Sequence, residues 1–288
     1  MDRVKIGLVG SGFAAALHME AYKQVYGIEP WVAAVASPSE RAGDFAREYG
    51  IPSVYRCMEE MIRKERPDVV DICSPPSLHA PMIGSAMGAG CHVICEKPLT
   101  GWFGDSAEPD MAKKVMEQLE QLRRVVERSG RKFFYAENFI YAPAVQKSAS
   151  LIRAAGEHIL FMRGEESHSG SHAGHAALWS MNGGGSLIRQ GCHPLSALLY
   201  LKQLENGKGA KAVGVTADMG YIVPTLNEEE RKNIQARPKD VEDLANVILT
   251  FEDGTKALIT AGDMILGGVR NEIQVYTTGG VYQCRIAP

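Results

Sequence analysis

The sequence predicts an α/β protein with two domains. Through the first half, short apolar runs of strand length alternate with helical patterns, which is typical of a doubly wound parallel sheet with helices on both faces. From Ala210 onward strand signals dominate, and glycine-containing turns between them predict an open, mostly antiparallel sheet. A chain of 288 residues is also long for a single core. We expect one domain over residues 1–137 and a second over residues 138–288.

Composition and charge exclude several classes of partner. A net charge of -3 offers no basic surface for nucleic acid or for an anionic membrane. No apolar run has the length of a membrane span, and the first residues lead directly into a predicted strand, so we expect a cytoplasmic protein. The six cysteines form no CxxC pair, which favours reduced thiols over disulfides or a zinc site.

The loop after the first predicted strand has the form G-x-G-x-x-A. Gly10 and Gly12 allow a tight turn and a close approach of the backbone to a pyrophosphate, and the small Ala15 allows a helix to pack closely on the strand. A helix is expected to follow from Phe13 to about Tyr26, and its amino end favours the phosphate charge. We interpret Gly10, Gly12, Phe13 and Ala15 as residues of a dinucleotide-binding loop. The alternative is a tight turn with a purely structural role.

The end of the second predicted strand, residues 31–36, bears on the choice between NAD and NADP. NAD-selective proteins usually carry an acidic residue there for the ribose hydroxyls, but this chain has Ser37. Ser37, Ser39 and Arg41 could instead receive a 2′-phosphate, because arginine matches phosphate geometry. We expect NAD or NADP as cofactor, with a slight preference for NADP. Arg41 could equally be a solvated helix residue.

Two further strand ends carry candidate site residues. Ser74, Pro75 and His79 follow the strand expected at residues 69–73, where a contact to the nicotinamide half of the cofactor would be natural. His79 could also be a helix-start residue that makes local hydrogen bonds. The strand at residues 93–95 leads directly into Glu96 and Lys97, both of which we place near the cofactor.

Lys97 is the central candidate of the first domain. Pro98 fixes its own φ and restricts Lys97 to extended geometry, so the lysine is held at the carboxyl end of a strand, where α/β sheets bind ligands. The alternative is a solvated loop lysine paired with Glu96.

Three stretches together resemble one family. GSGFAA at residues 10–15, SPPSLHAPM at residues 74–82 and AGCHVICEKPLTG at residues 89–101 are similar to the glucose–fructose oxidoreductase, inositol dehydrogenase and rhizopine-catabolism (Gfo/Idh/MocA) superfamily. The resemblance implies a Rossmann domain, a second α/β domain whose open sheet covers the nicotinamide, and NAD(P)-dependent oxidation of sugars, polyols or related hydroxy compounds. It also implies a catalytic role for Lys97 and a homo-oligomer formed through the carboxyl-terminal sheet.

The resemblance extends to the glycine-rich stretch at residues 183–194. The family has a D-x-G-x-H pattern here whose histidine serves in proton transfer, and His193 takes that position. Imidazole titrates near neutral pH, so it can accept a hydroxyl proton as hydride leaves the same carbon. The alternative is a satisfied core histidine. Arg189 stands where the family has its aspartate, and Ser196 stands where an acid is often found. Arg189 could bind a carboxylate, which would favour a sugar acid as substrate.

Other polar residues of the second domain are candidates for substrate binding. Asn138 lies in the crossing between the domains, beside Tyr141, for which a packing role is as plausible. His168, His172 and His175 lie within eight residues of one another in a Gly/Ser-rich loop. Metal binding is one interpretation. We favour hydrogen bonds from His168 or His172 to a polyhydroxylated substrate, or a structural loop, and expect no metal.

Other activities of the family also stay open from sequence. Some relatives release an isomer without net redox change, some are glycosidases that use NAD transiently, and some are noncatalytic nucleotide-sensing regulators. Relatives usually continue past the strand expected near Val281, whereas this sequence ends at Pro288. From the sequence we therefore expect the last strands or a closing helix of the family to be absent.

Overall fold

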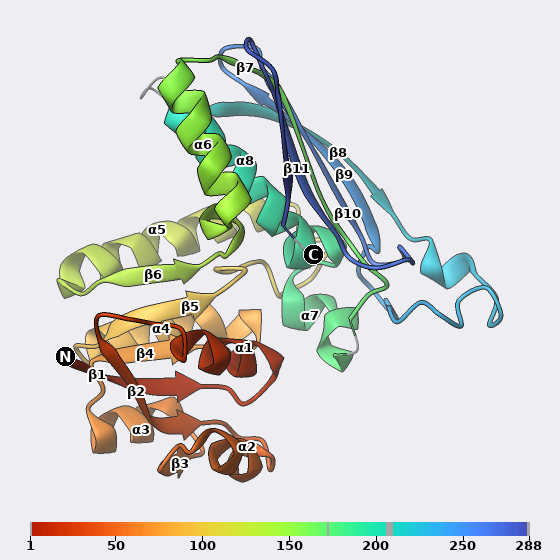
Figure 1. Cartoon of the computed structure of the whole chain (residues 1–288). Helices are drawn as coiled ribbons and strands as arrows, with labels where there is room; N and C mark the ends of the chain where they lie inside the picture. The colour runs from red at the N-terminus through yellow and green to blue at the C-terminus, as the bar shows by residue number, and fades with distance from the viewer. Residues whose placement is uncertain (1, 172, 206–209, 287–288) are drawn as a thin grey trace. The chain divides into compact units, whose positions relative to one another are not determined.

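The structure is a computed structural model that describes residues 2–171, 173–205 and 210–286. The chain divides into two compact units, Met1–Ala136 and Glu137–Pro288. Each unit is built on its own six-stranded sheet (Figure 1). Among the helices of the described residues, none combines the length and the apolar composition that crossing a bilayer requires.

The first unit contains a parallel sheet with strand order β3-β2-β1-β4-β5-β6. The strands are β1 (Arg3–Val9), β2 (Glu29–Ala36), β3 (Ser53–Tyr55), β4 (Val69–Ile72), β5 (His92–Glu96) and β6 (Phe133–Ala136). The strand order reverses between β1 and β4. In sheets of this kind the crevice at the carboxyl ends of those strands is where ligands bind.

Helices cover both faces of this sheet. They are α1 (Phe13–Tyr22), α2 (Ala42–Tyr49), α3 (Met58–Glu65), α4 (His79–Gly88) and α5 (Met111–Ser129), with a 3₁₀ turn at Pro76–Leu78. Ala15 and Phe45 bring α1 and α2 into one apolar cluster. Met61, Ile83 and Leu122 bring α3, α4 and α5 into another. These two clusters are the core of the unit, as a doubly wound sheet requires.

The first helix is shorter than expected. It ends at Tyr22 rather than near Tyr26, because Gln24 and Val25 donate backbone hydrogen bonds to residues three positions earlier, which turns the chain. Gly27 then takes a φ of 89°, which a helix cannot continue. The prediction for this boundary was wrong by one helical turn.

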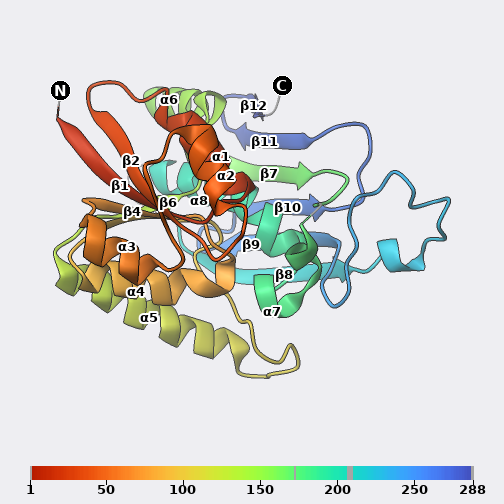
Figure 2. The same cartoon turned by 90° about the horizontal axis from the view of Figure 1, so that it is seen from below.

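The second unit contains a mixed, mostly antiparallel sheet with strand order β12-β11-β7-β10-β9-β8, most of which can be followed in Figure 2. The strands are β7 (Ile159–Ser167), β8 (Ala212–Gly220), β9 (Leu244–Phe251), β10 (Lys256–Gly262), β11 (Arg270–Thr277) and β12 (Val281–Arg285). Within this sheet β7 pairs in parallel with β10, and all other pairs are antiparallel. The two sheets confirm the predicted fold class.

Two helices pack on one face of the second sheet. Helices α6 (Pro143–Ala155) and α8 (Cys192–Leu204) lie on this face in Figure 1. Their buried side chains, among them Val145 and Leu198, form one apolar core with the inward residues of the sheet. Strand β8 ends at Gly220, because the carboxylate of Asp243 accepts hydrogen bonds from the N–H groups of Ile222 and Val223 just beyond it.

Candidate functional site

The loop after β1 contains two glycines, and a different physical reason explains glycine at each position. Gly10 has a φ of 105°, and a Cβ there would lie 2.5 Å from the carbonyl oxygen of Cys73, so the fold itself requires glycine. Gly12 has an extended backbone, and no atom lies within 4 Å of the position of its missing Cβ. The protein leaves open space beside Gly12, which fits the close approach of a pyrophosphate.

The start of α1 completes this loop. The helix begins at Phe13 with Gly12 at its cap, so its first backbone N–H groups are directed at the loop, and its dipole favours an anion there. The side chain of Phe13 is 81% exposed, whereas Ala15 is fully buried against the sheet. Ala15 therefore contributes close packing, and Gly12 and Phe13 offer the accessible surface.

Serine hydroxyl groups gather at the carboxyl end of β2. The hydroxyl of Ser11 donates to that of Ser37 over 3.0 Å, and Ser37 Oγ also accepts the backbone N–H of Ser39. Arg41 is exposed at the cap of α2, and its N–H donates to Ser39 Oγ. Ser37, the residue after β2, thus shares a hydrogen bond with the hydroxyl of Ser11, and Arg41 lies four residues further along the chain.

His79 is buried beneath the loops that contain Ser74 and Pro98, and it does not reach the surface. Its ring is fully buried, with Nδ1 2.7 Å from the carbonyl oxygen of Pro98 and Nε2 2.9 Å from that of Ser74. Burial lowers the pKa of His79 despite these contacts. A neutral imidazole carries one N–H, so it donates to one carbonyl and touches the other. His79 therefore ties the loop at Ser74 and Pro75 to the loop that holds Lys97.

Lys97 follows β5, and each carboxylate oxygen of its neighbour Glu96 accepts a hydrogen bond. One carboxylate oxygen of Glu96 accepts the backbone N–H of Lys97 over 3.0 Å, and the other accepts Nε2–H of His18 over 3.0 Å. Burial would raise the pKa of Glu96, but the hydrogen bond and charge of His18 outweigh it and lower the pKa. Lys97 itself is partly buried, and its peptide bond to Pro98 is cis.

A buried polar network underlies this edge of the sheet, and the sequence reasoning missed it. His18 on α1 donates Nδ1–H to the fully buried carboxylate of Asp71 over 2.8 Å, and the hydroxyl of Tyr22 donates to the same oxygen over 2.7 Å. Burial opposes a charge on His18, but hydrogen bonds to Asp71, Cys73 and Glu96 prevail and raise its pKa to about 12. His18 is therefore an imidazolium between two carboxylates. The signal in the sequence was Asp71, an acid inside an otherwise apolar strand.

In the second unit, Glu242 shapes the turn that leads to His193. Its carboxylate accepts the N–H groups of Gly185 over 2.7 Å and Leu187 over 2.9 Å, and a Cβ on Gly185 would overlap the carbonyl oxygen of Glu242. Burial raises the pKa of Glu242. A π-helical turn, Leu187–Gly191, follows and runs into α8. Such turns are frequent at functional sites.

Arg189 on this turn forms an ion pair within the unit. Its guanidinium binds the carboxylate of Asp263, which the side-chain amide of Gln190 also contacts, and Asp263 is buried. The positive charge of Arg189 is therefore balanced by an acid that the sequence did not single out.

His193 contacts an acid that lies far away in sequence. Its Nδ1 is 2.8 Å from the carboxylate of Glu137, the first residue of the second unit, and its ring stacks on Phe139 with centroids 4.9 Å apart. Both His193 and Glu137 are buried. Sequence reasoning identified the histidine but not its partner.

The remaining predicted residues are dispersed. Asn138 is exposed, and its backbone carbonyl oxygen accepts a hydrogen bond from the backbone N–H of Tyr141. Nδ1 of His168 accepts the N–H of Gly170 over 2.9 Å, and His175 is exposed. His172 lies outside the described residues. Within the described part of the loop, neither His168 nor His175 belongs to a group with metal-ligand spacing.

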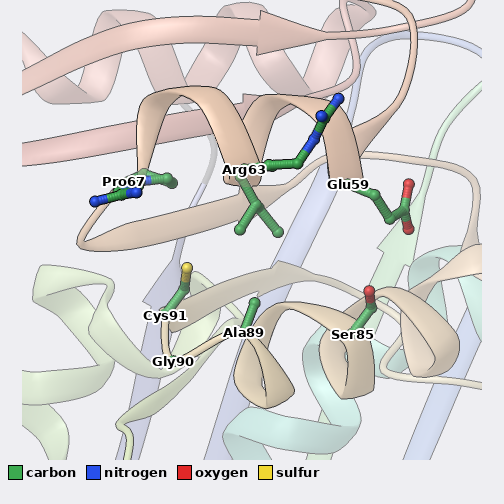
Figure 3. Close-up of a pocket in the computed structure, with 9 residues that line it drawn as sticks. Glu59, Arg63, Pro67, Ser85, Ala89, Gly90 and Cys91 are labelled. Carbon is green, nitrogen blue, oxygen red and sulfur yellow. The ribbon is translucent and has the colours of Figure 1, made fainter.

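A surface cavity of the first unit is unrelated to these residues. Figure 3 shows a surface cavity of 590 Å³ between α3 and α4, lined by residues that include Glu59, Arg63, Ser85 and Cys91. It lies where the chain enters β4 and β5. In a parallel sheet this is the edge opposite to the one that carries Gly12 and Glu96.

Alanine substitutions at the two glycines should affect different properties, nucleotide affinity at Gly12 and stability at Gly10. Gly12→Ala meets no atom and keeps an allowed φ, so we expect an unfolding free energy within about 0.5 kcal/mol of wild type and a nucleotide Kd at least about tenfold weaker. Gly10→Ala should destabilise the fold itself. Urea unfolding and NADPH fluorescence titration measure both quantities. Wild-type nucleotide affinity in Gly12→Ala would contradict a pyrophosphate at this loop.

Removal of the buried imidazolium should be costly. His18→Gln leaves Asp71 and Glu96 without their cation, so we expect a loss of about 3–5 kcal/mol in unfolding free energy near pH 7. The raised pKa of His18 means that its stabilisation is complete below pH 6.5 and declines as pH rises towards about 12. The difference in unfolding free energy between wild type and variant, measured by urea titration, should therefore shrink by about 1.4 kcal/mol per pH unit between pH 7 and 9. The exposed His175→Gln is the control, and a difference that does not change with pH would refute the charge assignment.

Comparison with known proteins places both units in one family. Residues 4–128 match the model of an oxidoreductase family with an NAD-binding Rossmann fold (GFO/IDH/MocA), and residues 158–283 match a GFO/IDH/MocA C-terminal domain. The chain is 29% identical over 153 residues to D-apiose dehydrogenase of Paraburkholderia graminis, which is 53% of this chain and 37% of that protein. It is 31% identical over 161 residues to inositol 2-dehydrogenase of Rubrobacter xylanophilus, which is 56% of this chain and 43% of that protein. The chain thus spans less than half of the length of these two relatives.

A solved structure supports the same architecture. Levoglucosan dehydrogenase in complex with NADH and levoglucosan superposes with a TM-score of 0.82 at 23% identity, covering 99% of this chain and 74% of the other. At that identity the likeness concerns the fold. Because models of both family domains match consecutive parts of the sequence, the chain belongs to the GFO/IDH/MocA oxidoreductase family.

Proposed function

We propose that the protein is an NAD(P)-dependent oxidoreductase that transfers hydride between a nicotinamide cofactor and a hydroxyl group of a sugar or polyol. One observation carries the proposal. The open space beside Gly12 and the lysine that follows β5 belong to the carboxyl edge of one parallel sheet, at and beside the point where strand order reverses. Relatives named as dehydrogenases of D-apiose and of inositol support the class of substrate.

The residues present fit a dinucleotide. Gly10 and Gly12 would hold the pyrophosphate with the first N–H groups of α1, and Phe13 would border it. Ser74 and Pro75, tied in place by His79, would border the nicotinamide half, with Glu96 and Lys97 beside it. Ala15 serves through packing.

The end of β2 favours NADP over NAD in this proposal. Ser37 follows the strand and shares its hydroxyl with Ser11 and Ser39, so no carboxylate occupies that position to accept ribose hydroxyl groups. The exposed guanidinium of Arg41 could pair with a 2′-phosphate.

Lys97 and His193 have complementary roles in the proposed reaction. The Lys97 ammonium would donate a hydrogen bond to the reacting oxygen and stabilise the negative charge that develops there. His193 would accept the hydroxyl proton. The bound nicotinamide supplies the acceptor for hydride. The substrate carbon loses hydride, its oxygen loses a proton, and a carbonyl group forms.

The substrate of this proposal is neutral. Arg189 suggested a sugar acid from sequence, but Asp263 already balances its charge within the second unit. Asn138 and His168, together with His172, are the proposed hydrogen-bonding partners of substrate hydroxyl groups. A homo-oligomer through the second sheet is part of the proposal, supported by β8, which is exposed along nearly its whole length.

A substrate panel tests the function. Neutral sugars, polyols, aldonates and uronates are each incubated with NAD and with NADP, and reduced nicotinamide is followed by absorbance. We expect turnover of a neutral compound, with kcat/KM higher for NADP. Sugar release without net reduced cofactor would instead indicate a glycosidase. Nucleotide binding without turnover of any compound would indicate a regulator.

Lys97 can be tested separately. We expect Lys97→Met to lower kcat by at least about 100-fold, because a preorganised charge at the reacting oxygen is lost, with little change in nucleotide Kd. Steady-state kinetics measure kcat, and NADPH titration measures the nucleotide Kd. Lys23→Met, at an exposed lysine just after α1, should behave as wild type. A Lys97→Met enzyme with wild-type kcat would exclude the proposed role.

A further inference from the structure

The imidazole of His193 is immobilised by residues that the family resemblance did not indicate. Glu137 holds one edge of the ring through Nδ1, at 2.8 Å, and the ring of Phe139 covers one face at an interplanar angle of 19°. The same oxygen of Glu137 accepts the backbone N–H of Phe139 over 3.0 Å, so the carboxylate and the stacking ring are fixed together. The exposed fractions of Glu137 and His193 are 1% and 7%. Few other ring orientations are compatible with this packing.

The hydrogen bond determines which nitrogen can accept a proton. An ionised carboxylate only accepts hydrogen bonds, so Nδ1 of His193 carries the hydrogen. The neutral ring then has its lone pair on Nε2. Within the described residues, Nε2 has no hydrogen-bond partner. The carboxylate also stabilises the imidazolium that forms once Nε2 has taken a proton.

Neighbouring charged groups are occupied elsewhere. Arg189, four residues before His193, pairs with Asp263, and Glu242 binds the backbone of the glycine turn. Glu137 is the acid that contacts the ring. Its second oxygen is buried and, among the described residues, has no hydrogen-bond partner, so its interactions are concentrated on His193 and Phe139.

We propose that Glu137 is the positioning residue of His193: it fixes the Nδ1–H tautomer, makes Nε2 the atom that accepts the substrate proton, and stabilises the resulting imidazolium. The inference rests on the proposed hydride transfer. In the oxidative direction the hydroxyl proton moves to Nε2, Nδ1–H stays bonded to Glu137, and the bonding pair of the substrate C–H leaves as hydride. Glu137 itself exchanges no proton with the substrate.

A metal site is the competing interpretation of the same residues. Glu137, Cys192 and His193 offer ligand atoms within 4.8 Å of one another. The contact between Nδ1 and the carboxylate has the length of a hydrogen bond, however. Two ligand atoms on a tetrahedral zinc ion would be about 3.3 Å apart, given bonds of about 2.0 Å. The geometry therefore favours the hydrogen-bonded pair.

Two substitutions at Glu137 separate charge from geometry. Glu137→Gln keeps an oxygen that can accept from His193 and Phe139 but removes the charge, and Glu137→Ala removes both. We expect kcat to fall about 10-fold in the first and about 100-fold or more in the second, with the Kd for NADPH unchanged within about twofold. Cys192→Ser, at the neighbouring position, should retain wild-type kcat. Wild-type kcat in Glu137→Ala would overturn the proposal. So would stoichiometric zinc whose removal, like Cys192→Ser, abolishes activity.

A spectroscopic measurement tests the proposal without turnover. In protein labelled with ¹⁵N-histidine, the signals of His193 are identified by their loss in His193→Gln. We expect Nδ1 to carry the proton in wild type and in Glu137→Gln, and a mixture of tautomers in Glu137→Ala. A wild-type signal from the Nε2–H tautomer would overturn the proposal. If no compound is turned over, the proposed function fails, whereas the tautomer still decides the role of Glu137 towards His193.

Discussion

The desolvation of carboxylates at the carboxyl edge of the first sheet constrains much of the first unit. Asp71 on β4 is fully buried and Glu96 on β5 is partly buried, and burial of an unpaired charge costs several kcal/mol. His18 satisfies both acids at once, and to do so α1 must lie over the junction of β1, β4 and β5. The same helix presents its amino end to the glycine loop. One ion pair network thus connects α1, which begins at the glycine loop, with the backbone N–H of Lys97.

The first unit could be predicted from sequence to a large extent because its signals are local. Alternating apolar runs predicted its strands, and the glycines at 10 and 12 predicted the loop. The partners of its histidines could not be predicted. Asp71 lies 53 residues from His18, and Pro98 lies 19 residues from His79. No sequence period encodes such contacts, since they depend on which strand ends meet in the folded sheet.

The second unit was predicted less completely, for the same physical reason. The strand pattern predicted its open sheet, but strand ends depend on single side chains such as Asp243, which captures two backbone N–H groups. The family resemblance drew attention to Arg189, which stands at a position where the family has an aspartate. In the fold, an acid reaches His193 from position 137 instead, 56 residues away. The acid that contacts His193 is thus one that only the tertiary structure brings to the ring.

The crossing between the units has an unusual consequence for chain length. Ala136 ends β6 in register with Glu96, and the very next residue, Glu137, buries its carboxylate beside His193. Connections between domains commonly tolerate insertions and deletions because they bury little. Here Glu137, Phe139 and His193 all belong to the second unit, and a residue inserted between Glu137 and Phe139 would separate the carboxylate from the backbone N–H and the aromatic ring that accompany it at the imidazole. The short segment from 137 to 139 should therefore keep its length.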